Sequence, residues 1–142
     1  FVARAMAVKI RVIQQDPFEK GIRAALNLGH TIGHGIEKAT HFAVQHGEAV
    51  AIGTVLEARL AEELGLAKPG LAEQLAELFA NVGLPVTLPQ GIDLAEVRDA
   101  MTLDKKKSGG KVRFALPVRI GEVRTGVTVD DSALAHVLCS PK

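Results

Sequence analysis

The stretch that decides the fold reads RAALNLGHTIGHGIE, from Arg23 to Glu37. It contains two histidines, His30 and His34, four residues apart, and a glycine precedes each of them. On a helix this spacing puts both imidazoles on one face. Glycine inside a helix costs about 1 kcal/mol relative to alanine, so these glycines indicate a close approach to the backbone, by a ligand or by a second helix. We therefore predict a helix over residues 26–39 that presents histidines to a site.

A third histidine, His46, stands where the next helix is expected to start. A hairpin of two helices would bring His46 back toward His30 and His34. Imidazole nitrogen is a common zinc ligand, and three protein ligands with one open position are typical of catalytic zinc. The alternative is that these histidines are ordinary surface or core residues that bind no metal. Glu48 is expected either to cap its helix or to orient a ligand.

The sequence outside this window predicts a mainly α-helical domain with a small antiparallel β element. Apolar residues recur at helical spacing from Leu71 to Val82, and Asp16 and Asp93 are placed as helix N-caps. Residues 112–116 and 123–129 alternate between apolar and other side chains, as in two strands joined by a turn. Strands do not alternate with helices and no glycine-rich phosphate loop is present, which argues against a parallel α/β sheet. The expected helices span residues 1–15, 26–39, 48–64, 71–82, 93–101 and 130–138.

Composition narrows the class of protein. The 142 residues suffice for one domain, and a net charge of +1 gives no argument for a nucleic-acid partner. Charged residues interrupt every apolar run well short of a membrane span. The single cysteine, Cys139, excludes an internal disulfide, fits a reducing cytoplasmic compartment, and is expected to be a small buried apolar residue. The chain starts without methionine and inside a helical pattern, so we expect a fragment of a longer protein.

Two windows together, residues 23–37 and 46–53, resemble the signature of the 3-dehydroquinate synthase family of sugar-phosphate cyclases. Further matches, in the same order along the chain, are Lys9 and residues 16–21, 101–107 and 113–121. The resemblance implies that residues 1–142 form the helical, metal- and substrate-binding C-terminal domain of this fold. It also implies that the N-terminal, NAD-binding domain is absent, so that the isolated chain is inactive.

The resemblance also implies a reaction. The family converts 3-deoxy-arabino-heptulosonate 7-phosphate to 3-dehydroquinate and phosphate, in the shikimate pathway of aromatic amino-acid biosynthesis. NAD transiently oxidises a ring hydroxyl, phosphate is eliminated, the ketone is reduced again, and an intramolecular aldol step closes the carbocycle. Zn²⁺, or another divalent metal such as Co²⁺, polarises the hydroxyl that is oxidised. The full-length enzyme is implied to be a cytoplasmic homodimer with no nucleic-acid or membrane partner.

The same resemblance implies roles for individual residues. His30 and His46 match metal ligands, and His34 matches a residue that contacts the substrate rather than the metal. The third metal ligand is implied to be a glutamate of the absent N-terminal half. The other implied substrate contacts are Lys9, Arg23, Asn27 and one of the two lysines Lys105 and Lys106.

Arg23 has two possible partners. If its segment is α-helical, Arg23 and Asn27 share a face close to the turn that presents His30, and the guanidinium can bind a substrate phosphate or carboxylate through two hydrogen bonds. Alternatively, Arg23 pairs with Glu19 as an exposed ion pair contributing less than about 1 kcal/mol.

Three other functions remain open at this point. The first is another cyclase of the same superfamily, of the deoxy-inosose or valiolone synthase type. The second is a metal-dependent polyol dehydrogenase, against which the matches at 23–27 and 104–106 argue, because such an enzyme has no phosphate to hold. The third is a non-catalytic helical interaction module with incidental histidines. His41 and His136 match no family position and are expected at the surface.

Overall fold

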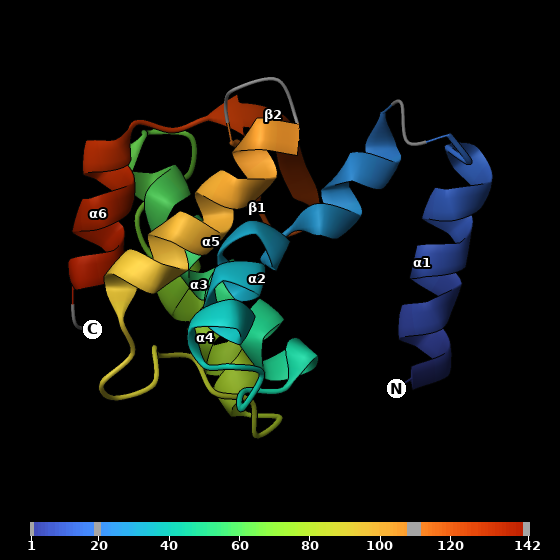
Figure 1. Cartoon of the computed structure of the whole chain (residues 1–142). Helices are drawn as coiled ribbons and strands as arrows, with labels where there is room; N and C mark the ends of the chain where they lie inside the picture. The colour runs from blue at the N-terminus through green and yellow to red at the C-terminus, as the bar shows by residue number, and fades with distance from the viewer. Residues whose placement is uncertain (1, 19–20, 108–111, 141–142) are drawn as a thin grey trace.

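The computed structural model describes residues 2–18, 21–107 and 112–140, and the side chains of 103–107 lie outside the description. Helices surround one central helix and a two-stranded sheet packs beside them (Figure 1). This confirms the expected mainly α-helical fold with a small antiparallel β element. The elements, in chain order, are α1 (Val2–Gln15), the 3₁₀ helix η1 (Ile22–Asn27), α2 (His30–Ala39), α3 (His46–Glu63), α4 (Leu71–Ala80), α5 (Leu94–Lys107), β1 (Arg113–Arg119), β2 (Glu122–Thr128) and α6 (Asp131–Cys139).

Helix α3 is the central helix. It contacts α2, α4, β1 and α6, and its middle is buried on every side, as the apolar run after Glu48 predicts. Ile52 and Leu60 of α3 are fully buried and pack with Ile32 and Ile36 of α2 in the core. Helix α2 lies between α3 and α5, so the histidine-bearing segment is held by helices on two sides.

The sheet closes one side of the core. β1 and β2 pair antiparallel, with Phe114 opposite Val127. Phe114 and Leu116 of β1 are buried, whereas β2 is largely exposed. The two predicted strands are therefore confirmed, and only β1 contributes strongly to the core.

The start of α2 differs from the prediction. The helix begins at His30 rather than at Leu26, because Gly29 adopts φ +77° and residues 22–27 form a 3₁₀ helix. Asp16 does not start an α-helix either. Its Oδ2 instead accepts hydrogen bonds from the backbone N–H groups of Gly21 (2.7 Å) and Arg23 (3.0 Å), which fixes the entry into η1.

Three smaller expectations are also wrong. The helix that follows Asp93 extends beyond Met101 to Lys107. On the apolar face expected along 71–82, Leu71 is buried but Leu78 and Val82 are exposed, since α4 covers only one edge of α3. Cys139, expected to be buried, is exposed at the end of α6.

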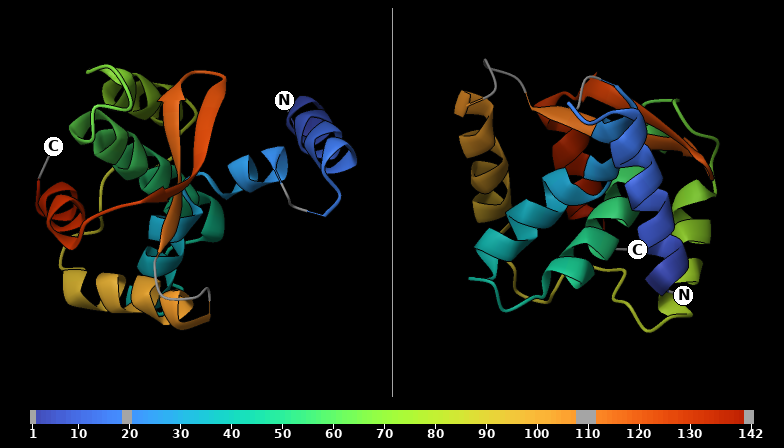
Figure 2. Two further views of the ribbon diagram at one scale, coloured as in Figure 1. Left: turned by 90° about the horizontal axis from the view of Figure 1, so that it is seen from above. Right: turned by 90° about the vertical axis from the view of Figure 1, so that its right-hand side faces the viewer.

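Helix α1 stands apart from the rest of the molecule (Figure 2). It packs mainly against η1, and none of its described residues is buried. Several of its apolar side chains are therefore exposed, namely Val2, Met6, Val8 and Ile10. A search of the described part of the chain finds no helix with the length and apolar character needed to span a membrane.

Candidate metal centre

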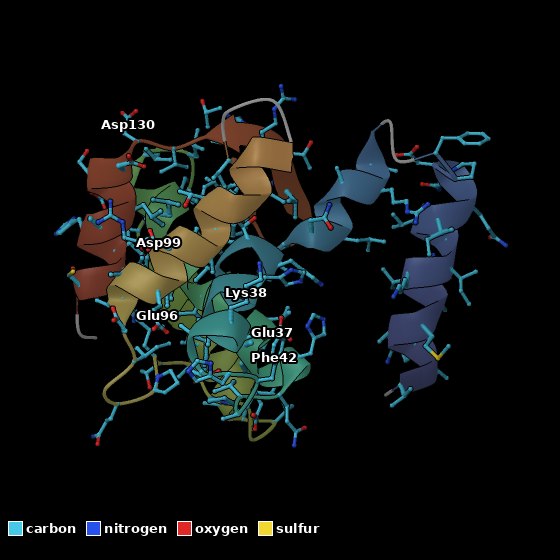
Figure 3. The ribbon with its side chains drawn as sticks, in the orientation of Figure 1. Glu37, Lys38, Phe42, Glu96, Asp99 and Asp130 are labelled. Atoms are coloured by element: carbon cyan, nitrogen blue, oxygen red, sulfur yellow. The ribbon has the colours of Figure 1, made fainter. Side chains whose placement is uncertain are left out.

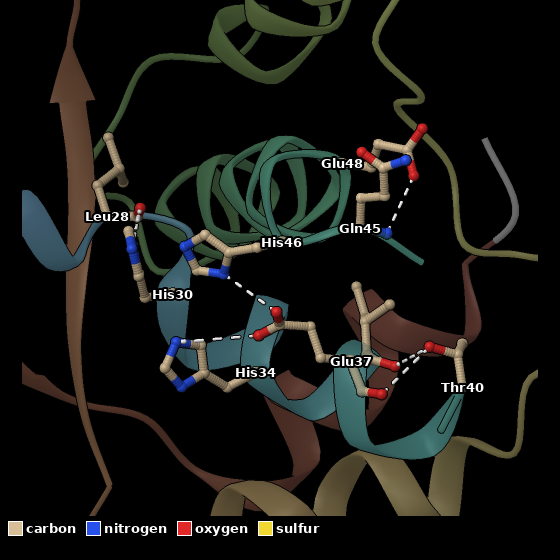
Figure 4. Close-up of polar contacts among 9 residues, drawn as sticks. Leu28, His30, His34, Glu37, Thr40, Gln45, His46 and Glu48 are labelled. Atoms are coloured by element: carbon tan, nitrogen blue, oxygen red, sulfur yellow. Dashed lines mark hydrogen bonds and ion pairs between the residues drawn. The ribbon is translucent and has the colours of Figure 1, made fainter. Parts of the chain in front are cut away.

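Three imidazoles from two helices face one another at the open edge of the α2–α3 pair (Figure 4). The ring centres of His30 and His46 are 5.3 Å apart, those of His30 and His34 5.6 Å, and those of His34 and His46 5.9 Å. Two imidazoles that bind one tetrahedral zinc ion through nitrogens at about 2.0–2.1 Å have ring centres roughly 5 Å apart. The spacing of all three pairs is therefore close to what a shared metal ion requires.

Hydrogen bonds at Nδ1 determine which nitrogen of His30 and of His46 remains free. His30 Nδ1 lies 3.0 Å from the carbonyl oxygen of Leu28, and His46 Nδ1 lies 3.1 Å from Glu37 Oε1. A carbonyl oxygen and a carboxylate oxygen only accept hydrogen bonds, so each Nδ1 carries the proton. In the neutral form of each ring, Nε2 then keeps its lone pair, which is the state that a metal ligand needs.

Glu37 is the residue that sequence reasoning missed. It lies near the α2–α3 connection, close to Phe42 (Figure 3), whose backbone N–H donates to the Glu37 carbonyl oxygen over 2.7 Å. The Glu37 carboxylate sits between two rings, 3.1 Å from His46 Nδ1 and 4.0 Å from His34 Nε2, and its side chain is only 13% exposed. The sequence did contain a signal for this contact, because Glu37 follows His34 by three residues and so lies on the same face of the helix.

A second set of donors overlaps the first. One donor atom from each of His34, Glu37 and His46 lies within 4.8 Å of the other two. The pair His30 and His46, which the family resemblance implies, and this second set share His46. The first set offers two imidazole nitrogens and the second adds a carboxylate oxygen, and both kinds of donor fit a divalent ion such as zinc.

The glycines of the histidine window serve helix packing. A Cβ atom on Gly33 would lie 3.1 Å from the Ala49 carbonyl oxygen, and one on Gly53 would lie 2.2 Å from that of Gly29. A Cβ on Gly35 would lie 2.9 Å from the carbonyl oxygen of Val97 in α5. Of the two explanations that the sequence left open, the structure therefore shows close approach of helices at these positions.

The expected substrate contacts are not all gathered near the histidines. Arg23 in η1 is half-buried, and its guanidinium donates to the Pro17 carbonyl oxygen over 2.8 Å. Asn27 is exposed at the end of η1. Four residues of a 3₁₀ helix correspond to one and a third turns, so these two residues do not share a face as an α-helix would require. Lys9 is exposed on α1, which packs mainly against η1.

The remaining candidates either make local contacts or lie outside the part of the chain that the structure describes. Lys105 and Lys106 belong to the last turns of α5, and their side chains are outside the described part of the structure, as is Glu19, the other partner proposed for Arg23. Glu48 caps its helix, because its Oε2 accepts the Gln45 backbone N–H over 3.1 Å. His41 and His136 are exposed, as expected, the latter with Nδ1 3.0 Å from Glu63.

Comparison with solved structures identifies the fold first. It matches that of 2-epi-5-epi-valiolone synthase from Streptomyces hygroscopicus, with NAD⁺ and Zn²⁺ bound, at a TM-score of 0.80 and 24% identity over 96% of this chain. A 2-deoxy-scyllo-inosose synthase complexed with carbaglucose-6-phosphate, NAD⁺ and Co²⁺ aligns at a TM-score of 0.82 and 24% identity over 93% of this chain. These alignments cover 38% and 39% of the two solved chains and establish the shared fold.

Sequence comparison then gives the family. The family model for the 3-dehydroquinate synthase C-terminal region matches residues 1–107. The 3-dehydroquinate synthases of a Synechococcus strain and of Nostoc punctiforme are 46% and 44% identical, over 95% and 96% of this chain. The chain therefore belongs to the 3-dehydroquinate synthase family. It spans 37% and 38% of the length of these two relatives.

Proposed function

We propose that this chain is the metal- and substrate-binding part of a 3-dehydroquinate synthase. In the whole enzyme it would act on 3-deoxy-arabino-heptulosonate 7-phosphate, and a further N-terminal domain would bind NAD. The observation that carries the proposal is the convergence of His30, His34 and His46 at ring spacings of 5.3–5.9 Å. Identities of 44–46% to curated 3-dehydroquinate synthases favour this member of the superfamily over the other cyclases, whose identity is 24%.

His30 and His46 would hold the metal through Nε2, with a glutamate of the N-terminal half as third ligand. When bound, Zn²⁺ or Co²⁺ polarises the hydroxyl group that is oxidised. Within this chain, Leu28 and Glu37 hold the two rings in the required tautomer through their hydrogen bonds to Nδ1. The mostly buried Glu37 also supplies a negative charge that favours a cation between the rings.

The other residues would bind the substrate. His34 is exposed at the same edge as the metal pair, and its ring is free to meet a substrate oxygen. Arg23 uses part of its guanidinium to bind Pro17 and retains N–H groups for a phosphate or carboxylate. Lys9 and one of Lys105 and Lys106 would add positive charge around the same dianion. Because Lys9 lies on α1, its role depends on how α1 meets the N-terminal half.

The proposal divides the reaction between two parts of one enzyme, and this division is testable. The purified 142-residue chain, supplied with Zn²⁺, NAD⁺ and the heptulosonate phosphate, should release no phosphate. The same chain joined to its N-terminal half should release phosphate and contain one divalent ion per polypeptide, measured by atomic emission. Turnover by the isolated chain would contradict the division, and a metal-free active enzyme would contradict the assignment of His30 and His46.

We infer in addition that the whole enzyme is a cytoplasmic homodimer. The cytoplasmic location is supported by the single, exposed and unbridged Cys139, which fits a reducing compartment. The dimer is an expectation that the family resemblance implies, and light scattering of the full-length enzyme would test it.

A further inference from the structure

The N-terminal turn of α2 contains the first histidine of the metal centre. The backbone N–H groups of a first helical turn have no acceptor within their own helix. A polar side chain just before the helix usually accepts from one of them. In α2 the N-cap is Gly29, at φ +77°, and no side chain at the N-cap provides such a bond. The acceptors for this turn must therefore come from elsewhere in the fold.

They come from Glu57, in the middle of α3. Glu57 is fully buried, at 0% exposure, although every other fully buried large side chain in the described core is apolar. Its Oε2 accepts the Gly29 N–H over 2.5 Å, and its Oε1 lies 3.4 Å from the Ile32 nitrogen. The backbone N–H of Thr31 is a third donor to the same carboxyl group. One side chain of a neighbouring helix thus accepts from the backbone N–H groups of Gly29, Thr31 and Ile32 at the start of α2.

The surrounding packing leaves little space for a substitute acceptor. A Cβ atom on Gly29 would lie 2.2 Å from Thr54 Oγ1 and 2.5 Å from the Val50 carbonyl oxygen. The backbones of the turn and of α3 are therefore in direct contact. If the Glu57 carboxyl group were removed, the turn could satisfy its N–H groups only by moving away from α3 toward water.

Such a movement would carry His30 with it. His30 directly follows Gly29, and its ring is oriented by a hydrogen bond from Nδ1 to the carbonyl oxygen of Leu28, in the same turn. His46, in contrast, belongs to α3 itself. The 5.3 Å spacing between the two rings therefore depends on how the turn is held against α3.

We propose that Glu57 is a positioning residue that holds the first turn of α2 against α3 and thereby sets the place of His30 relative to His46. This inference rests on the proposed metal-binding function of the two histidines. Glu57 acts through the backbone of α2, because it lies eleven residues from His46, or about 16 Å along the helix axis.

The test compares volume-conserving variants at two similar positions. Glu57→Met keeps the length of the side chain but removes both acceptors, and Glu57→Gln keeps one carbonyl acceptor. Glu62→Met is the matched control, because Glu62 of α3 accepts the Ala72 N–H (2.9 Å) in the first turn of α4, away from the histidines. Each variant of the 142-residue chain is examined for folding by circular dichroism, for Zn²⁺ affinity by calorimetry, and for the nuclear Overhauser effect between the His30 and His46 ring protons.

In Glu57→Met we expect Zn²⁺ to bind at least about tenfold more weakly, as found for residues that orient metal ligands. The nuclear Overhauser effect between the His30 and His46 ring protons should be lost. Glu57→Gln should stay within about threefold of wild type, and Glu62→Met should change neither quantity. A folded Glu57→Met chain with unchanged affinity and ring contact would overturn the proposal, as would equal losses in Glu57→Met and Glu57→Gln.

Two further outcomes are also decisive. If the wild-type chain binds no Zn²⁺ without the third ligand of the N-terminal half, the metal-free ring contact between His30 and His46 decides the role of Glu57. If Glu57→Met does not fold, Glu57→Gln decides through amide hydrogen exchange. Protection of Gly29 together with retained affinity supports the proposal, whereas an unprotected Gly29 with retained affinity overturns it.

Discussion

Replacing Gly53 by alanine should force α2 and α3 apart. The added Cβ would lie 2.2 Å from the Gly29 carbonyl oxygen and 2.8 Å from the Gly33 nitrogen. Both are backbone atoms within the packed pair of helices, so neither can rotate away as a side chain would. Overpacking of this kind costs about 1–3 kcal/mol and occasionally more, whereas the alanine itself favours an α-helix by about 1 kcal/mol. Because both clashes are with backbone atoms, the cost lies at the upper end of this range, and we expect a net loss of about 2 kcal/mol in the free energy of unfolding.

The same helix provides the control. Gly47, also in α3, has no atom within 4 Å of an added Cβ, so Gly47→Ala should leave stability unchanged or raise it by up to about 1 kcal/mol. Urea unfolding followed by circular dichroism measures both variants, and Zn²⁺ titration measures the centre that the helix pair supports. Equal stability of Gly53→Ala and Gly47→Ala would refute the view that backbone contact at Gly53 holds the two helices together.

Three other perturbations test the site and its surroundings. Arg23→Lys in the whole enzyme should lower kcat/KM at least about tenfold, or roughly 1.4 kcal/mol, with an unchanged Tm; full activity would leave Arg23 as a surface residue. Glu37→Gln should weaken Zn²⁺ binding about tenfold, because a neutral amide holds the His46 Nδ1–H less firmly; calorimetry measures it. Burial raises the pKa of Glu57 to about 8, although the backbone hydrogen bonds that the carboxyl group accepts lower it in part. Glu57 is therefore more readily protonated in the folded chain, and its contribution to stability should be full below about pH 4.5 and fall as the pH rises to about 8. Urea unfolding should show this slope in wild type and not in Glu57→Gln.

Local signals in the sequence were sufficient for most of the fold. Near neighbours in the chain are enough to predict three features that the structure confirms: the cap by Glu48, one of its two expected roles, the alternation around Phe114, and the buried apolar run after Glu48. The start of α2 could not be predicted in this way. It depends on a 3₁₀ segment and on Gly29, which lies so close to α3 that an added Cβ would collide with Thr54 and Val50.

In the candidate site, too, some features follow from local sequence signals and others depend on tertiary contacts. The four-residue spacing of His30 and His34 is a local signal, and the approach of His46 follows from a simple helical hairpin. The contact between Glu37 and His46 is tertiary, since it joins the last part of α2 to the first residue of α3. Glu57 did leave a signal that went unused, because it is a charged residue within a stretch of α3 whose neighbours are buried and apolar.

The glycines connect these observations. A side chain at Gly33 or Gly53 would separate α2 from α3, and the two proposed metal ligands lie on different members of this pair. The ring spacing of His30 and His46 therefore depends on the distance between two backbones, which no choice of histidine rotamer can fully restore once it has changed. The buried carboxyl group of Glu57 complements this contact, because the close packing of the two helices lets one α3 side chain reach the first turn of α2. The geometry of the proposed metal centre therefore depends on the packing of α2 against α3, so substitutions remote from the histidines should affect it.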